Sequence, residues 1–137
     1  MDEQSAHNEL LAYTLSHGDP AFIHQHVVDA WMAQHADQST KPIGITFALV
    51  GLYLHLEKGF SGRQVQRVHM ALGNRKRQWS TFTLPPDRGR VTALDVMAAP
   101  AGSERDRTID AWCSSVWSAY HDSHEAVASL LQHHGIG

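Results

Sequence analysis

The 137-residue sequence lacks the features that mark several large classes of protein. It has one cysteine, Cys113, which excludes an intrachain disulfide, and nothing in it requires an oxidising compartment. Its longest uncharged apolar run, Ile43 to Leu56, is too short to cross a bilayer comfortably and is typical of a buried core helix. Residues Met1 to Asn8 are polar and acidic, unlike a secretory signal. We therefore expect a cytoplasmic protein with no membrane partner.

Charge is also scarce. Charged residues make up 18% of the sequence and the formal net charge is only −3, which by itself implies no polyanionic partner. The hydrophobic fraction of 42% argues against disorder, which needs low hydrophobicity combined with high net charge. A chain of this length can bury its own core, so we expect one domain over residues 1–137.

Apolar residues recur at helical spacing through most of the chain, and turn and cap residues separate these segments. Gly18 suits a helix end, and Asp19-Pro20 suits the next helix start. Ser61 is a candidate N-cap, and Thr92 with Asp95 resembles a capping box. We expect helices over about 6–17, 20–36, 43–58, 61–73, 93–99 and from 103 to about 134, with a kink or restart at 122–123.

These patterns predict an all-α fold, a single compact helical bundle-like domain of five or six helices around a central apolar helix at 43–56. Residues 74–91 break the helical pattern and are expected to form an irregular crossover, with a short extended piece near 81–84. The residues expected in the core are Ile45, Leu49, Leu52, Leu56, Val65, Leu72, Trp112 and Val116.

Histidine is unusually abundant: the eleven histidines equal the sum of lysine and arginine. Four predicted helices each place one histidine on or near an inward face: His26, His55, His69 and His124. Neutral imidazole is a common ligand of transition metals, and helical bundles build metal sites from inward side chains on facing helices. The pattern predicts a site for zinc or another divalent transition metal, with Asp29 or Glu57 as a carboxylate partner.

The number of converging ligands would decide what such a site does. Three ligands and an open position would activate a water molecule and make the protein a metal-dependent hydrolase, whereas four would make a structural site. Fewer than three would leave the histidines as packing residues, bonded to carbonyls, carboxylates or water. The sequence has no HExxH or ExxH pair, so this alternative stays open.

Three further readings remain. One is nucleic-acid binding, because the helices before and after Ser61 suit a helix-turn-helix and a basic stretch overlaps the second of them. The net negative charge of the chain disfavours this function. The basic residues are Arg63, Arg67, Arg75, Lys76, Arg77, Arg88 and Arg90. Cys113 lies on an apolar stripe, as a buried and inert thiol does. A non-enzymatic structural or interaction domain, with a small molecule, a protein or a second copy as partner, fits the sequence equally.

The segments GDPAFIHQHVVDA (18–30) and GLYLHLEKGF (51–60), with KPIG (41–44) and RQVQRVH (63–69), resemble a bacterial family of unknown function over about residues 10–127. The resemblance implies a single helical domain, and the family has no established activity that could be carried over to this chain. Some members of that family begin with a segment of paired cysteines, which could bind zinc. This chain lacks that segment, so the resemblance implies no zinc site of that kind here. A looser resemblance to helical-bundle metalloproteins of the DinB type concerns architecture alone, since the histidine spacing differs.

Overall fold

The computed structural model describes residues 1–17, 21–75, 79 and 81–136. These residues contain helices and no strand, so the all-α prediction is confirmed and the extended piece expected near 81–84 forms no strand. The helices are α1 (Glu3–Leu15), α2 (His24–His35), α3 (Pro42–Lys58), α4 (Gly62–Arg75), α5 (Ala93–Ala98), α6 (Ser103–Ala119), a 3-10 turn η1 (His121–Ser123) and α7 (His124–His133).

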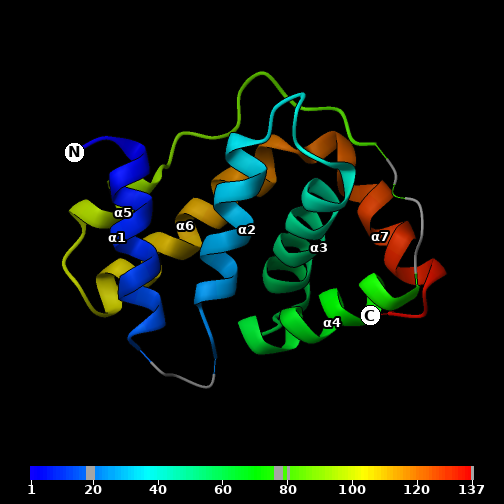
Figure 1. The fold of residues 1–137 in the computed structure, drawn as a ribbon, viewed down its shortest axis with the longest axis horizontal. Coiled ribbons are helices and arrows are strands. Elements are labelled where there is room, and N and C mark those ends of the chain that lie inside the picture. The colour runs from blue at the N-terminus through cyan, green and yellow to red at the C-terminus, as the bar shows by residue number, and fades with distance from the viewer. Residues whose placement is uncertain (18–20, 76–78, 80, 137) are drawn as a thin grey trace.

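The apolar helix α3 occupies the centre, as predicted, and contacts α2, α4, α6 and α7 (Figure 1). Helices α1 and α5 pack together on the far side of α2. Of the eight core residues predicted, seven are buried and Leu56 is partly buried. Among the described residues no helix, α3 included, is long and apolar enough to cross a membrane.

Local capping chemistry sets several helix boundaries. Gly59 ends α3 with a left-handed φ of 71°, a conformation that glycine adopts without steric cost. Ser61 accepts the N–H of Gln64, and the Gln64 side chain accepts the N–H of Ser61, which makes a reciprocal capping box at the start of α4. The predicted box of Thr92 and Asp95 is present at α5. The caps expected at Gly18 and Asp19 lie outside the described residues.

The prediction that α2 begins near residue 20 is wrong, because residues 21–23 are not helical and α2 starts at His24. Phe22 has a φ of 55°, a left-handed conformation that no α-helix continues through. This bend lets the segment dock on α4, where a side chain at Gly62 would collide with the carbonyl of Phe22 and the Arg63 guanidinium lies 4.1 Å above the Phe22 ring.

The described residues form seven α-helices, one more than the upper prediction, because the last helical region is divided. The break falls at Tyr120 and the 3-10 turn after it, where a kink or restart was expected. Tyr120 is buried, and its hydroxyl donates to the carbonyl of Ala33 on α2. This bond fixes the direction in which the chain leaves α6.

Helix α4 runs to Arg75, into the segment predicted as a crossover, and the described residues between α4 and α5, 79 and 81–92, form neither helix nor strand. Phe82 is buried, and Trp79 packs edge-on against Phe47 of α3. The guanidinium of Arg88 donates to the carbonyls of Pro85, Gln34 and Ala36, so it ties the crossover both to itself and to the end of α2. The crossover is therefore held by specific bonds and passes over the ends of the helices (Figure 1).

Candidate functional site

Two of the four predicted ligands, His26 of α2 and His55 of α3, lie in direct contact. Their rings are stacked, with centroids 3.6 Å apart and planes inclined by 16°. His26 is buried and His55 is partly buried. An imidazole nitrogen binds a metal about 2.0–2.1 Å away, in the plane of its own ring. One ion cannot lie in both of two stacked planes, so this pair does not chelate an ion as arranged.

His69 of α4 lies at the other end of α3. Its Nε2 donates to the carbonyl of Phe47 at 2.8 Å, and its ring stacks on the Phe47 ring at 4.7 Å. Burial lowers the pKa of His69 to about 4, although the bond to Phe47 acts in the opposite direction. Phe47 and His55 are eight residues apart on α3, which corresponds to roughly 12 Å.

His124 of α7 is bonded in the same way as His69. Its Nε2 donates to the carbonyl of Trp117 at 2.7 Å, and its ring stacks on the Trp117 indole at 3.8 Å. Trp117 lies seven residues beyond Asp110, the partner of His55, which is roughly 10 Å along α6. The structure therefore brings together two of the four histidines, fewer than the three ligands of a zinc hydrolase.

The expected carboxylate partners are also engaged elsewhere. Glu57 accepts a hydrogen bond from the indole of Trp117 at 3.2 Å, and Asp29 accepts one from Gln25 at 3.1 Å. Within the described part of the chain, no group of three or more histidine, cysteine, aspartate or glutamate side chains is arranged to hold a metal ion.

The stacked pair forms part of a cleft of about 460 Å³. One wall is the first half of α6, and the other is the turn between α3 and α4 together with the segment before α2. The size falls in the range of small-molecule sites, which are about 300–1,000 Å³. The lining residues are Ala21, Ile23, His26, His55, Gly59, Phe60, Ser61, Ser103, Asp106, Arg107, Ile109 and Asp110.

His55 connects the two walls. Its Nε2 lies 2.9 Å from Oδ1 of Asp110, and its Nδ1 lies 3.4 Å from the carbonyl of Phe60. Both partners are acceptors, so the ring satisfies both at once only as the imidazolium. The hydrogen bond from His55, reinforced by the nearby charges of His55 and His26, lowers the pKa of Asp110 below its usual value against the opposing effect of burial. The cleft thus presents an oriented, ionised carboxylate.

A second carboxylate lies one turn earlier on the same wall. Asp106 accepts a hydrogen bond from the Tyr13 hydroxyl at 3.0 Å, and that hydroxyl accepts the N–H of Gly102. This relay joins α1 to the start of α6. Asp106 and Asp110 are spaced i, i+4, so they lie on one face of the helix. The side chain of Arg107 is exposed on the same wall.

A buried carboxyl group lies about one helical turn from the stacked pair, on α2. Asp29 is 2% exposed, and burial raises its pKa well above the usual value. Its second oxygen, Oδ2, has no hydrogen-bond partner among the described residues and packs against Gly51, where an added methyl group would lie 1.8 Å from it. The absence of a side chain at Gly51 of α3 therefore makes room for the Asp29 side chain.

Packing accounts for part of the remaining predicted chemistry. The Cys113 thiol is buried and contacts the carbonyl of His26 at 3.7 Å, and burial raises its pKa, which disfavours the thiolate. Of the basic stretch, Arg63 stacks on Phe22 and Arg88 clamps the crossover. Lys76 and Arg77 lie outside the described residues. The helix-turn-helix reading stays a prediction.

Sequence reasoning missed Asp106 and Asp110. Neither residue is among the ligands or carboxylate partners that the sequence predicts. The i, i+4 spacing of the two carboxylates next to the buried Ile109 is visible in the sequence and marks the edge of the buried stripe of α6. The partner of Asp110 is 55 residues away in the chain, so only the tertiary fold reveals it.

No curated protein and no solved structure matches this chain. Residues 4–121 match the profile of a family of unknown function, DUF5946, which covers every element described up to η1. The chain belongs to this family of unknown function.

Proposed function

We propose that the protein is a binding domain whose cleft takes a small organic amine. The observation that carries the proposal is the bond between His55 and Asp110 at 2.9 Å, which orients an ionised carboxylate at the cleft. A charge-assisted hydrogen bond to such a carboxylate is among the stronger polar interactions in proteins. Asp106, on the same face of α6, offers a second acceptor.

The stacked histidines support the recognition group. His26 is buried against His55 and limits the orientations that the His55 ring can adopt. A fixed partner lowers the entropy that Asp110 loses when a ligand binds. Arg107 on the same wall would pair with an anionic group if the amine carried one.

Butylamine and butyrate are matched probes for this cleft, because they share a carbon chain and differ in the sign of their charge. Histidine side-chain NMR spectra during titration at constant pH report on the environment of His55. We expect butylamine to shift the His55 resonances saturably and butyrate to leave them unchanged. Equal responses to the two probes would refute recognition by Asp110.

A zinc titration separates this proposal from the metal site that the sequence predicts. Zinc that binds at one equivalent, and is lost in His55→Ala, would favour the metal site, since the stacked rings would then have to separate. If the His55 resonances shift with butylamine and are unaffected by zinc, the amine-binding proposal stands. A protein unaffected by either compound would refute both proposals.

A further inference from the structure

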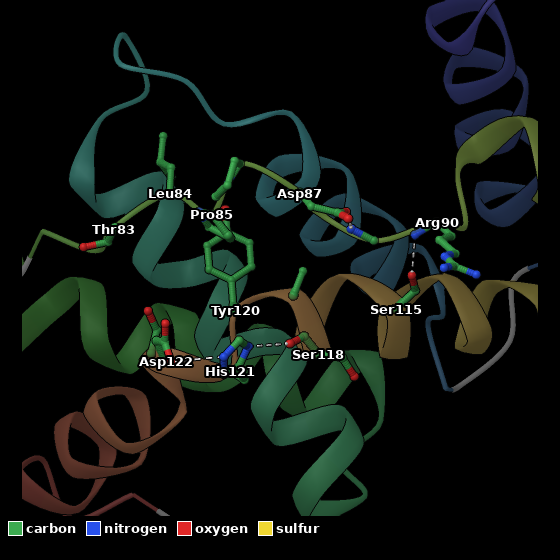
Figure 2. A pocket seen from close by; sticks show the side chains of 14 residues that line it. Thr83, Leu84, Pro85, Asp87, Arg90, Ser115, Ser118, Tyr120, His121 and Asp122 are labelled. Atoms are coloured by element: carbon green, nitrogen blue, oxygen red, sulfur yellow. Dashed lines mark hydrogen bonds and ion pairs between the residues drawn. The ribbon is translucent and has the colours of Figure 1, made fainter.

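A groove of about 580 Å³ lies between the crossover and the end of α6. In Figure 2 the crossover runs above it, and the last turn of α6 with η1 runs below. The groove shares no lining residue with the cleft of the proposed function.

The upper wall of the groove is fixed before any ligand arrives. Besides the clamp by Arg88, the hydroxyl of Ser115 accepts the backbone N–H groups of Arg90 at 2.9 Å and Val91 at 3.4 Å. Gly89 has a φ of 100° and lies so close to Ser115 that a side chain there would collide. These contacts pin one end of the crossover to α6, and its remainder arches over the helix.

The middle of the groove is apolar. Leu84, Pro85 and Pro86 line it from above, and Ala119 and Tyr120 line it from below. Proline has no N–H group, so this part of the crossover backbone offers few donors to a ligand. The carbonyl of Pro85 already accepts from Arg88, and the hydroxyl of Tyr120 already donates to Ala33. The part of a ligand that lies here is therefore apolar.

The charged side chains around the groove differ in whether they already have bonding partners within the protein. His121 lies 3.1 Å from Asp122 and 3.3 Å from the carbonyl of Ser118, so both of its ring nitrogens already have partners (Figure 2). Asp87 accepts the backbone N–H of Gly89. The guanidinium of Arg90 forms no ion pair within the described part of the chain. Among the residues that line the groove, Arg90 is thus the cationic side chain without an anionic partner, and an anionic group on a ligand would complement it.

From the apolar lining and this unmatched cation we propose that the groove binds a free small molecule with an apolar body and one anionic group, such as a carboxylate or sulfonate. The apolar body lies against Pro85, Pro86 and Ala119, which are at least partly exposed, and the anionic group pairs with Arg90. This site is independent of the amine cleft, so either can fail without the other.

The probe 1-anilinonaphthalene-8-sulfonate has this chemistry, and N-phenyl-1-naphthylamine is the same ring system without the sulfonate. We expect saturable fluorescence enhancement by the anionic probe with one site per chain, and weaker binding of the neutral probe. Arg90→Gln should weaken the anionic probe by about two- to fivefold, as an exposed ion pair does, and leave the neutral probe unchanged.

Filling the groove tests its location. Ser118 is exposed and lines the groove, so Ser118→Trp should abolish binding of both probes. Ser114 is exposed on the same helix outside the groove, and Ser114→Trp is the matched control. Both variants are first checked for native helix content and melting temperature. Binding that survives Ser118→Trp in a folded protein would overturn the site, and equal affinity for the two probes would overturn the anionic class.

Discussion

The histidines that contact the two ends of α3 differ in what their nitrogens contact: His69 of α4 packs near Phe47, and His55 lies near the last turn of α3 itself. At the Phe47 end, Nε2 of His69 donates to a backbone carbonyl and the ring stacks on a phenyl ring, so both contacts are made with the fold itself. At the other end, His55 faces a carboxylate across a cleft and stacks on a second imidazole. The difference shows that the bonding partner of an inward histidine, more than its degree of burial, determines what the histidine can do.

Leu52 lies between the two ends and supports both, so its replacement is expected to have the largest effect. It is 1% exposed. Leu52→Ala should lower the free energy of unfolding by about 2–5 kcal/mol, because it removes buried methyl groups and leaves a cavity. Urea unfolding followed by circular dichroism measures the change. A loss below about 1 kcal/mol would show that the centre of α3 is less tightly packed than described.

His69 should make the protein sensitive to acid. Its folded pKa is about 4 and its usual value is 6.5, so the unfolded chain binds a proton first as the pH falls. Stability is therefore full above about pH 6.5 and declines down to about pH 4, by up to about 3 kcal/mol from this group. Burial also lowers the pKa of His7 and His24, which adds to the same trend.

Unfolding measured between pH 7 and pH 4 checks this. His69→Gln keeps a side-chain donor for Phe47 and should flatten the decline, whereas His133→Gln, on the exposed face of α7, is the control and should not. An unchanged pH dependence in His69→Gln would contradict the assignment.

In the middle of α3, the contact between Asp29 and Gly51 should be sensitive to one methyl group. Gly51→Ala places that group 1.8 Å from the carboxyl of Asp29, and overpacking of this kind costs about 1–3 kcal/mol. Gly73→Ala on α4 is the control, since its nearest neighbour would be an ordinary 3.7 Å from the Phe47 ring. Asp29→Ala should relieve part of the loss in the double variant. Additive effects of the two substitutions would mean that the two residues are not in contact.

The sequence was sufficient for features that repeat along one helix. The stripe of Ile109, Trp112 and Val116 predicted the buried face of α6, and the apolar composition of α3 predicted its central place. It was insufficient where the outcome depends on the direction of a side chain. Inward spacing placed His69 and His55 alike, and only the carbonyl of Phe47 and the carboxylate of Asp110 distinguish them.

The same limit explains the wrong start of α2. Proline at position 20 suits a first helical turn, but the helix begins after Phe22, whose left-handed backbone is compatible with docking on Gly62. That contact joins residues 40 positions apart, and no local pattern reports it. The cleft has the same origin, because its walls come from α6 and from the turn between α3 and α4.

The smallest effect on stability is expected where the effect on binding is largest. Asp110 is largely exposed at the rim, with 62% of its side chain accessible, and exposed ion pairs contribute only about 0.2–1 kcal/mol. Asp110→Asn should therefore change the unfolding free energy by less than about 1 kcal/mol and abolish the response of His55 to butylamine. The pair of His121 and Asp122, at 3.1 Å, has the same chemistry on an exposed surface outside the cleft, so Asp122→Asn is the matched control. It should leave the butylamine response intact. If both variants bind butylamine as the native protein does, the carboxylate of Asp110 has no part in recognition, and the two ends of α3 differ in packing alone.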